Sequence, residues 1–142
     1  VPFFGQGMNC GFEDCMVLDQ LIDQCDSNWD KILTAYEENR KPDADAIAEL
    51  ALNNFIEMRD LVTDEKFLLR KKIEAKLTEL YPTEWIPLYT MVTFSTMRYS
   101  EALRLGKIQD ELMAKTIAST SPSDSIETIN YAGLINEYKK MK

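Results

Sequence analysis

Apolar residues recur at helical spacing through most of the chain, and this pattern predicts a mainly α-helical protein. In the segment FEDCMVLDQLIDQC the acidic residues Glu13 and Asp14 suit the first turn of a helix, because negative charge is stabilised at that end. The apolar positions of this helix are Val17, Leu18, Leu21, Ile22 and Cys25. The segment WDKILTAYEENR predicts a second helix, whose inward-facing positions are Trp29, Ile32, Leu33 and Tyr36.

Two prolines divide the helical pattern that follows. We expect Pro42 to end the second helix and Asp43 to be the N-cap of a third. The third helix is expected over residues 44–80, with a kink near residues 63–64, until Pro82 stops it. Its apolar stripe consists of Ile47, Leu50, Ala51, Met58 and Leu61.

The last part of the chain contains one segment without helical periodicity. The segment WIPLYTMVTFS combines β-branched and aromatic residues with a proline, which is typical of extended chain or of an irregular buried loop. A further helix is expected over residues 99–118, and the segment STSPSDS then forms a turn. Asp124 and Glu127 match a capping box for a last helix.

Composition narrows the class of protein. A chain of 142 residues can form one domain with a sizeable core, and 45% hydrophobic with 28% charged residues is typical of a globular protein. The formal net charge of -8 argues against nucleic-acid binding, which depends on a basic surface. The absence of histidine excludes histidine-based triads and histidine-containing zinc sites within this chain, and we expect no metal.

The chain also lacks targeting signals. No apolar run approaches the roughly 18 residues that a membrane-spanning helix needs, and no signal-peptide pattern opens the sequence. Cys10, Cys15 and Cys25 contain no C-x-x-C pair, so they are expected to be reduced thiols buried as small hydrophobic side chains. These features predict a soluble, cytoplasmic protein without a membrane partner.

Three features carry candidate chemistry, and each has a structural alternative. The glycines of GQGMNCGFED precede a helix whose N-terminus could bind an anionic group, although a glycine turn that merely starts a helix is also common. Asn54 lies within the apolar stripe of the third helix, where its amide contacts either a ligand or neighbouring backbone and water. Tyr89 could offer its hydroxyl to a ligand or pack as an amphipathic core residue.

Three motifs, in this order, resemble a known family. VPFFGQGMNCGFEDC resembles the glycine-rich flavin-contacting motif of the single-component flavoprotein aromatic hydroxylases. NNFIEMRDLV and IPLYTMVTFS narrow the resemblance to the kynurenine-hydroxylating members, over residues 1–102, and beyond residue 102 it is thin. The resemblance implies the helical C-terminal fragment of an α+β enzyme whose Rossmann-like nucleotide-binding half is absent from this chain. The membrane-anchoring tail of mitochondrial members is missing, so the chain resembles a soluble bacterial form.

The resemblance also implies cofactors, a substrate and site residues. The family uses NADPH and FAD to convert L-kynurenine to 3-hydroxykynurenine in tryptophan degradation. The residues that match its FAD-contacting positions are Gly7, Met8 and Asn9. The residues that match its substrate pocket are Asn54 and Tyr89 at the amino-acid end of kynurenine, with Glu57, Met58, Phe3 and Gln6 around it. No catalytic residue is carried over.

These expectations divide the chain into three parts. Residues 1–41 would close the FAD-binding domain, residues 42–118 would contribute to the substrate pocket, and residues 119–142 would form a turn and a terminal helix. Without the N-terminal half, which could be a separate chain, we expect the fragment to be inactive. Two alternatives stay open at this point: a non-catalytic acidic helical interaction module, and a related flavin hydroxylase acting on another aromatic acid.

Overall fold

The computed structural model describes residues 4–61, 64–120 and 126–142. Within these ranges every regular element is helical and no strand occurs, which confirms the predicted mainly α fold. The elements in chain order are α1 (Gly7–Gln24), α2 (Trp29–Ile56), the π-helical turn η1 (Glu57–Leu61), α3 (Glu65–Leu80), α4 (Leu88–Thr93), α5 (Tyr99–Ser119), the short 3₁₀ helix η2 (Ile126–Thr128) and α6 (Tyr131–Met141).

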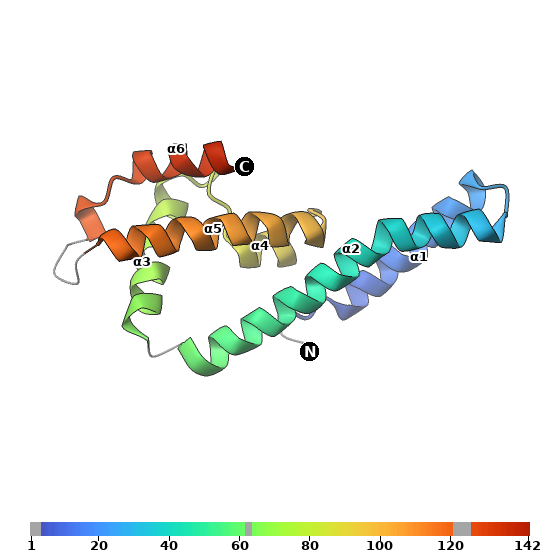
Figure 1. Ribbon diagram of the computed structural model, residues 1–142, viewed down its shortest axis with the longest axis horizontal. Coiled ribbons are helices and arrows are strands. Elements are labelled where there is room, and N and C mark those ends of the chain that lie inside the picture. The colour runs from blue at the N-terminus through green and yellow to red at the C-terminus, as the bar shows by residue number, and fades with distance from the viewer. Residues whose placement is uncertain (1–3, 62–63, 121–125) are drawn as a thin grey trace.

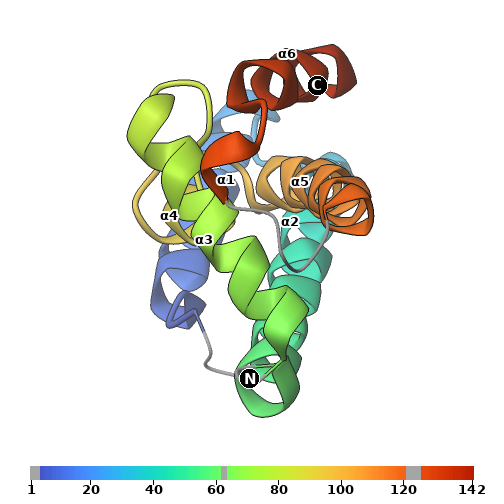
Figure 2. The ribbon, with the colours of Figure 1, turned by 90° about the vertical axis from the view of Figure 1, so that its left-hand side faces the viewer.

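The helices form two groups that meet in the middle of an elongated molecule (Figure 1). Helices α1 and α2 make a long antiparallel hairpin, and α2 returns from its tip to pack against α5. Helices α3, α4 and α6 surround α5 at the other end, and Figure 2 shows α3 crossing α5 while α6 lies on top. The C-terminal half of α2 therefore lies where the two groups meet.

Two apolar clusters hold this arrangement. The first joins α2, α4 and α5 and contains Phe4, Ala46, Leu50, Met91, Val92, Tyr99, Ala102 and Leu105. The second joins α3, α5 and α6 and contains Ile73, Leu77, Trp85, Leu112, Met113, Tyr131, Ile135 and Tyr138. Helix α5 contributes to both, so the two clusters meet along one helix.

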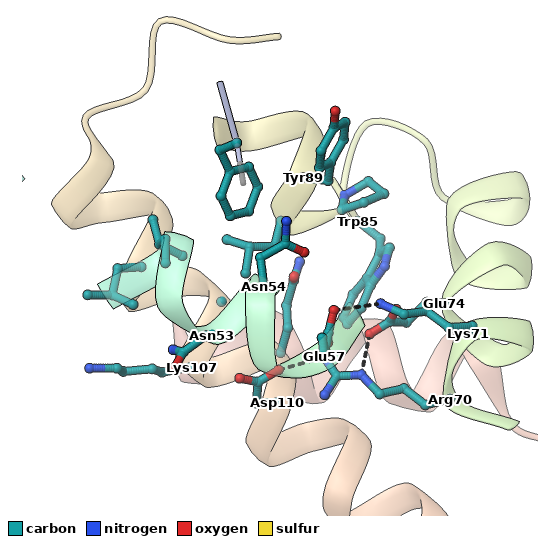
Figure 3. A pocket seen from close by; sticks show the side chains of 17 residues that line it. Asn53, Asn54, Glu57, Arg70, Lys71, Glu74, Trp85, Tyr89, Lys107 and Asp110 are labelled. Carbon is teal, nitrogen blue, oxygen red and sulfur yellow. Dashed lines mark hydrogen bonds and ion pairs between the residues drawn. The ribbon is translucent and has the colours of Figure 1, made fainter. Parts of the chain in front are cut away.

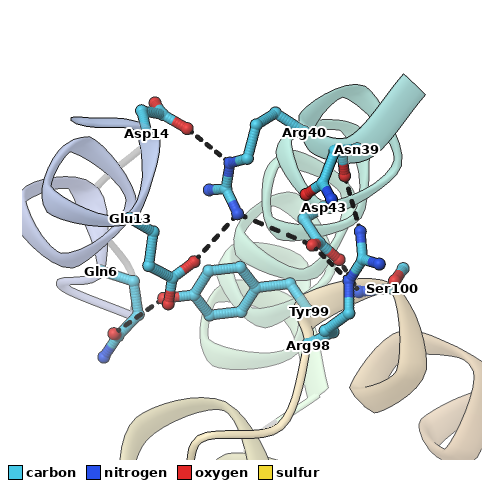
Figure 4. Close-up of polar contacts among 9 residues, drawn as sticks. All are labelled: Gln6, Glu13, Asp14, Asn39, Arg40, Asp43, Arg98, Tyr99 and Ser100. Atoms are coloured by element: carbon cyan, nitrogen blue, oxygen red, sulfur yellow. Dashed lines mark hydrogen bonds and ion pairs between the residues drawn. The ribbon is translucent and has the colours of Figure 1, made fainter. Parts of the chain in front are cut away.

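Pro42 does not end the second helix, contrary to our expectation, because α2 continues through it as a single helix of 28 residues. A proline inside a helix removes one backbone hydrogen bond and costs about 3 kcal/mol or more. Tertiary contacts on both sides of the proline offset this cost. Arg40 binds α1, and Asp43 binds the start of α5 (Figure 4).

Asp43 caps a helix, but not the one that its sequence position suggests. Its carboxylate accepts a hydrogen bond from the backbone N–H of Ser100 at 2.9 Å, in the first turn of α5. It also accepts from Arg98 Nε at 2.8 Å, and its side chain is only 2% exposed. The N-cap residue of α5 makes no side-chain cap hydrogen bond, so Asp43 of α2 supplies that cap from another helix.

Arg40 ties α2 to α1. Its guanidinium donates to Asp14 at 2.7 Å and to Glu13 at 3.2 Å, while its own side chain is almost fully buried. Helix α1 begins at Gly7, six residues before Glu13, so neither acidic residue lies in the first turn as predicted. The two carboxylates hold the hairpin together instead of capping α1.

Three further expectations differ from the structure. Leu88–Thr93 is the helix α4, not an irregular loop, because Met91 and Val92 face the first cluster at helical spacing. The last helix begins at Tyr131 and is capped by Asn130, whose side chain accepts from Gly133 N–H. Glu127 therefore lies in η2, and Asp124 lies outside the described residues.

Other boundaries are confirmed. The helix predicted to end before Pro82 does end at Leu80, and the helix expected over residues 99–118 is α5. The single kinked helix expected over residues 44–80 is wrong, because α2, η1 and α3 divide this span and Asp64 is the N-cap of a separate helix. The predicted division between residues 41 and 42 falls inside α2, and it stays a prediction.

Several predicted inward positions face outward. Ile32 is fully buried, but Trp29 and Leu33 are 55% and 59% exposed. Helix α1 has no buried residue, and its exposed apolar row contains Met8, Phe12 and Met16. The three free cysteines are half-buried or exposed, so the expectation that they are buried is wrong. None of the described helices is long and apolar enough to span a bilayer.

Candidate functional site

A cavity of about 220 Å³ opens where α2, α3, α4 and α5 meet (Figure 3). Asn54 from the last turn of α2, Glu57 from η1 and Tyr89 from α4 all line it. These residues are up to 35 positions apart in the sequence (89 minus 54), and the fold brings them together. The cavity therefore unites three of the residues that the sequence singled out.

The cavity has one apolar and one charged side. Its apolar lining residues are Phe4, Leu50, Trp85, Pro87, Leu88 and Leu103. Its charged lining residues are Glu57, Arg70, Lys71, Glu74, Lys107 and Asp110. An aromatic ligand with a polar or charged end matches such a lining, because the ring fits the apolar side and the polar end needs partners.

The charged side contains both tight and loose ion pairs. Arg70 donates to Glu74 at 2.7 Å and to Asp110 at 2.5 Å. Burial disfavours the charge of Arg70, but the neighbouring Glu74 and Asp110 carboxylates outweigh burial and raise its pKa. Lys71 lies 3.7 Å from Glu57 and 3.5 Å from Glu74, which is longer than a normal charged hydrogen bond.

Asn54 and Glu57 lie where α2 changes into a π-helical turn. The backbone N–H of Glu57 still donates to the carbonyl groups of Asn53 and Asn54, and the π-helical turn begins at this residue. Short π-helical turns inside helices occur frequently at functional sites, because they change the direction of neighbouring side chains. Asn54 is half-buried and has interactions within the protein, so its surroundings fit a structural role as well as a ligand-binding one.

Tyr89 is held by aromatic neighbours rather than by polar ones. Its ring stacks on Phe4 with 5.6 Å between centroids and meets Phe94 edge-on at 6.1 Å. The residue is 53% exposed, and its hydroxyl has no hydrogen-bond partner within the described ranges. Next to it, Leu88 packs so closely on Gly106 that an added Cβ would lie 3.0 Å from the leucine methyl groups. The glycine therefore lets α4 approach α5 and positions Tyr89.

The other predicted pocket residues do not line this cavity. Gln6 is 7% exposed and borders a separate hollow beside the start of α1. Its amide oxygen accepts from Asn9 at 2.7 Å and from Tyr99 at 3.3 Å, and its nitrogen donates to the Phe4 carbonyl. Met58 is 58% exposed, and Phe3 lies outside the described residues.

The start of α1 has the geometry of an anion-binding helix end. Gly7, Met8 and Asn9 form its first turn, and the N-cap residue makes no side-chain cap hydrogen bond. An added Cβ at Gly7 would meet nothing within 4 Å, and Met8 is 70% exposed, so the approach to this helix end is open. Gly5 has a φ of +68°, a backbone conformation that favours glycine.

Charges near this helix end are balanced within the protein. Burial opposes the charge of Arg40, but hydrogen bonds with Asp14 and the charges of Asp14 and Glu13 raise its pKa, so it stays protonated. Its positive charge lies between those two acidic residues of α1 (Figure 4). Arg40 therefore compensates negative charge that would otherwise oppose an anion at this end.

Sequence reasoning missed Trp85, Arg70 and Lys71 as lining residues. Trp85 follows Pro82 in a short segment that has no periodicity, and the two basic residues belong to a helix with charges on several sides. Their position in the cavity results from the crossing of α3 with α5, which no local pattern specifies. The only available signal was a tryptophan immediately before the IPLYTMVTFS motif.

Comparison with curated proteins shows which enzymes the sequence of this chain is similar to. No family model matches the chain. The chain is 50% identical over 129 residues to an enzyme of Flavobacterium johnsoniae, a match that covers 91% of this chain and 28% of the relative. It is 43% identical over 135 residues to an enzyme of Myxococcus xanthus and 47% identical over 121 residues to one of Anopheles gambiae. These relatives are monooxygenases.

All three relatives are kynurenine 3-monooxygenases. The similarity confirms the resemblance inferred from the three motifs and extends further than residue 102, since the Flavobacterium match includes 129 residues. The relatives include bacterial and animal enzymes, so the similarity does not single out a bacterial form. The chain spans a little over a quarter of the length of the curated relatives that it matches.

Proposed function

We propose that this chain is part of an NADPH- and FAD-dependent monooxygenase that converts L-kynurenine to 3-hydroxykynurenine. The observation that carries the proposal is 50% identity over 91% of the chain to a kynurenine 3-monooxygenase. The cavity adds independent support, because it combines an apolar side with charged residues and kynurenine combines an aromatic ring with an amino-acid group. The chain contributes one side of the substrate pocket and one cofactor-facing helix end.

In this proposal Asn54, Glu57 and Tyr89 orient the substrate. The carboxamide of Asn54 and the hydroxyl of Tyr89 bind the amino-acid end, and the Glu57 carboxylate faces its ammonium group. Tyr89 is suited to the role because its ring is fixed against Phe4 while its hydroxyl is available. Holding the remote end of the substrate positions the ring carbon that is hydroxylated, and correct orientation is a large part of catalysis.

The proposed FAD contacts are the backbone N–H groups of Gly7, Met8 and Asn9. FAD supplies the activation of oxygen, with NADPH as the reductant. An open helix N-terminus without a side-chain cap stabilises negative charge near the flavin edge. Phe4 borders both the cavity and the hollow beside this helix end, so the two proposed sites adjoin each other.

The proposed partner is the remainder of the same enzyme. Relatives are more than three times as long as the matched segment, and this chain lacks a nucleotide-binding fold in its described parts. The exposed apolar row Met8, Phe12 and Met16 on α1 fits a surface that the rest of the enzyme covers. Binding of FAD and NADPH would then depend chiefly on residues outside this chain.

The test is to express the longer protein that contains this sequence and to purify it with FAD. We expect NADPH oxidation to be stimulated by L-kynurenine and to yield 3-hydroxykynurenine, measured by chromatography. Anthranilate and 4-hydroxybenzoate are the control substrates. Hydroxylation of a control acid without turnover of kynurenine would favour the related-hydroxylase alternative. A protein that retains no FAD would favour the interaction module.

A further inference from the structure

The side chain of Gln6 is buried at the start of α1, yet it does not cap this helix. It is 7% exposed, and as the N-cap residue it makes no side-chain cap hydrogen bond. Tyr99, the first residue of α5, reaches its amide from the other side of the fold (Figure 4). We propose that Tyr99 is a positioning residue, which fixes the Gln6 amide so that it presents an N–H group to a carbonyl oxygen of a ligand beside α1. The inference rests on the proposed function and adds Tyr99 to it.

Hydrogen-bond chemistry determines which end of the Gln6 amide faces which neighbour. The Phe4 carbonyl can only accept, so the amide end that contacts it at 3.3 Å is the Nε2 donor. The opposite end is therefore the oxygen, which accepts from Asn9 Nδ2 at 2.7 Å and from the Tyr99 hydroxyl at 3.3 Å. Both acceptor positions of the oxygen are then occupied. No acceptor for the second N–H group of Nε2 is found among the described residues.

Tyr99 is itself held by other helices, so its hydroxyl has a defined position. Its ring is 4% exposed and belongs to the first apolar cluster. The next residue, Ser100, donates its backbone N–H to Asp43 of α2, which holds the first turn of α5. Burial raises the pKa of Tyr99, so the hydroxyl keeps the proton that it donates. Burial also raises the pKa of the neighbouring Cys10 thiol, so no thiolate competes for that proton.

The remaining N–H group of Gln6 restricts the ligand to one that presents an acceptor atom. Gln6 borders the hollow beside α1, and Phe4 lines both this hollow and the cavity. The proposed reaction brings two kinds of carbonyl acceptor to these adjoining sites, the ketone of L-kynurenine and the carbonyl groups of the flavin ring. An unrestrained amide would also present its oxygen, which repels a carbonyl. Tyr99 excludes that orientation and lowers the cost of ordering the amide when a ligand binds.

The experiment removes the hydroxyl of Tyr99 and keeps its ring. In the full-length flavoprotein, Tyr99→Phe frees the Gln6 amide to turn. The Kd values for L-kynurenine and for its analogue with a methylene group in place of the ketone are measured from the change in flavin absorbance. A rise of about three- to tenfold for kynurenine, but not for the analogue, assigns the acceptor to the substrate ketone.

The midpoint potential of the bound FAD, measured without substrate, is the second readout. A hydrogen bond to a flavin carbonyl stabilises the negative charge that reduction adds. A more negative potential in Tyr99→Phe, with both Kd values unchanged, therefore assigns the acceptor to the flavin.

Two further variants separate positioning from stability. Tyr131→Phe is the matched control, because Tyr131 is also buried and its hydroxyl donates to the Ile126 carbonyl within the part of the chain that forms the second cluster. It should lower Tm by a similar amount and change neither Kd nor the potential. Gln6→Met removes the amide, and in that background Tyr99→Phe should have no further effect on either readout, since Tyr99 acts through Gln6.

The outcomes separate the inference from the function on which it rests. A full-length flavoprotein that does not bind kynurenine overturns the proposed function, and the potential of its FAD then decides the inference. A wild type that binds kynurenine, with a Tyr99→Phe variant that changes only Tm, overturns the inference alone. Equal losses for kynurenine and its analogue at an unchanged potential also overturn it, as does an additive loss in the Gln6→Met background.

Discussion

Asn54 sits at the last turn of α2 with its side chain toward the cavity, next to residues of both charge signs (Figure 3). If its carboxamide binds the amino-acid end of the substrate, Asn54→Ala in the full-length enzyme should raise the KM for kynurenine. The loss of a hydrogen bond to a charged group lowers kcat/KM by about ten- to a hundredfold. Steady-state kinetics measure the change, and FAD content should stay the same.

Asn39→Ala is a suitable control for this change, because Asn39 is an exposed residue of the same helix outside the cavity. It should leave kcat/KM unaltered. If Asn54→Ala leaves the kinetics unaltered but lowers Tm, the amide has a structural role, which its interactions within the protein also allow.

Tyr89 offers a test that depends on a single oxygen atom. Tyr89→Phe keeps the stacking on Phe4 and removes only the hydroxyl, so stability should change little. We expect kcat/KM for kynurenine to fall by about tenfold, which corresponds to about 1.4 kcal/mol. Misplacement of the substrate should also lower the ratio of 3-hydroxykynurenine formed to NADPH oxidised, with hydrogen peroxide as the other product.

Tyr81→Phe removes a hydroxyl from a tyrosine outside the cavity and should change neither quantity. A wild-type ratio and a wild-type kcat/KM in Tyr89→Phe would make Tyr89 a packing residue. The proposed substrate contacts would then rest on Asn54 and Glu57 alone.

Among the elements, α5 depends on α2 for the cap at its start. Asp43→Ala removes the carboxylate that accepts from Ser100 N–H and Arg98, so the free energy of unfolding should fall by about 2–3 kcal/mol. Asp45→Ala removes an exposed carboxylate two residues away, paired with Lys41, and should cost less than about 1 kcal/mol. Denaturant unfolding of the full-length flavoprotein measures both, and equal losses would contradict the role of Asp43 as a cap.

The same carboxylate makes stability depend on pH. Burial acts to raise the pKa of Asp43, but hydrogen bonds from Ser100 and Arg98 outweigh it, so the pKa lies below its usual value of 3.8. A lowered pKa in the folded state stabilises the protein above the unfolded-state pKa, and this contribution disappears as the pH falls through the folded-state value. The stability difference between wild type and Asp43→Asn should therefore be constant near neutrality and shrink below about pH 4. A difference that persists unchanged in acid would contradict this linkage.

The comparison of sequence with structure shows which elements local patterns specify. Apolar spacing predicted α5 and the end of α3 correctly, because those boundaries depend on residues within the element. The pattern failed at Pro42, where contacts of Arg40 and Asp43 with other helices outweigh a local helix breaker. The pattern also predicted that Asp43 caps a helix, which it does, but the helix is α5 and not the one that was expected to begin at residue 44. A cap supplied from another helix leaves no signal in the local sequence.

The candidate site was predictable to a similar degree. Asn54 was recognisable as a polar residue within an apolar stripe, and Tyr89 through a motif resemblance. Trp85 and Lys71 were not recognisable, because their place in the cavity depends on how α3 crosses α5. The predicted roles of Gln6 and Met58 as pocket residues stay predictions, since neither residue lines this cavity.

For the whole molecule, the exposed apolar residues of α1 and the open helix end indicate a surface that needs more protein around it. We expect chain 1–142, produced alone, to be colourless and not to oxidise NADPH, since the proposed cofactor contacts here are a few backbone groups. Absorbance near the flavin bands after gel filtration measures this. A yellow preparation with stoichiometric FAD, free of any longer chain, would contradict the expectation.

The hydrogen bond from Tyr99 to Gln6 has a consequence for the order of folding. It joins residues 93 positions apart, whereas the contact of Arg40 with Asp14 closes a loop of 26. By chain entropy the longer loop costs about 1 kcal/mol more to close. During synthesis the hairpin of α1 and α2 can therefore form first, and the start of α1 acquires its final geometry only after α5 has been made and has docked. If FAD binds at that helix end as proposed, its capture would be among the last events in the maturation of the enzyme.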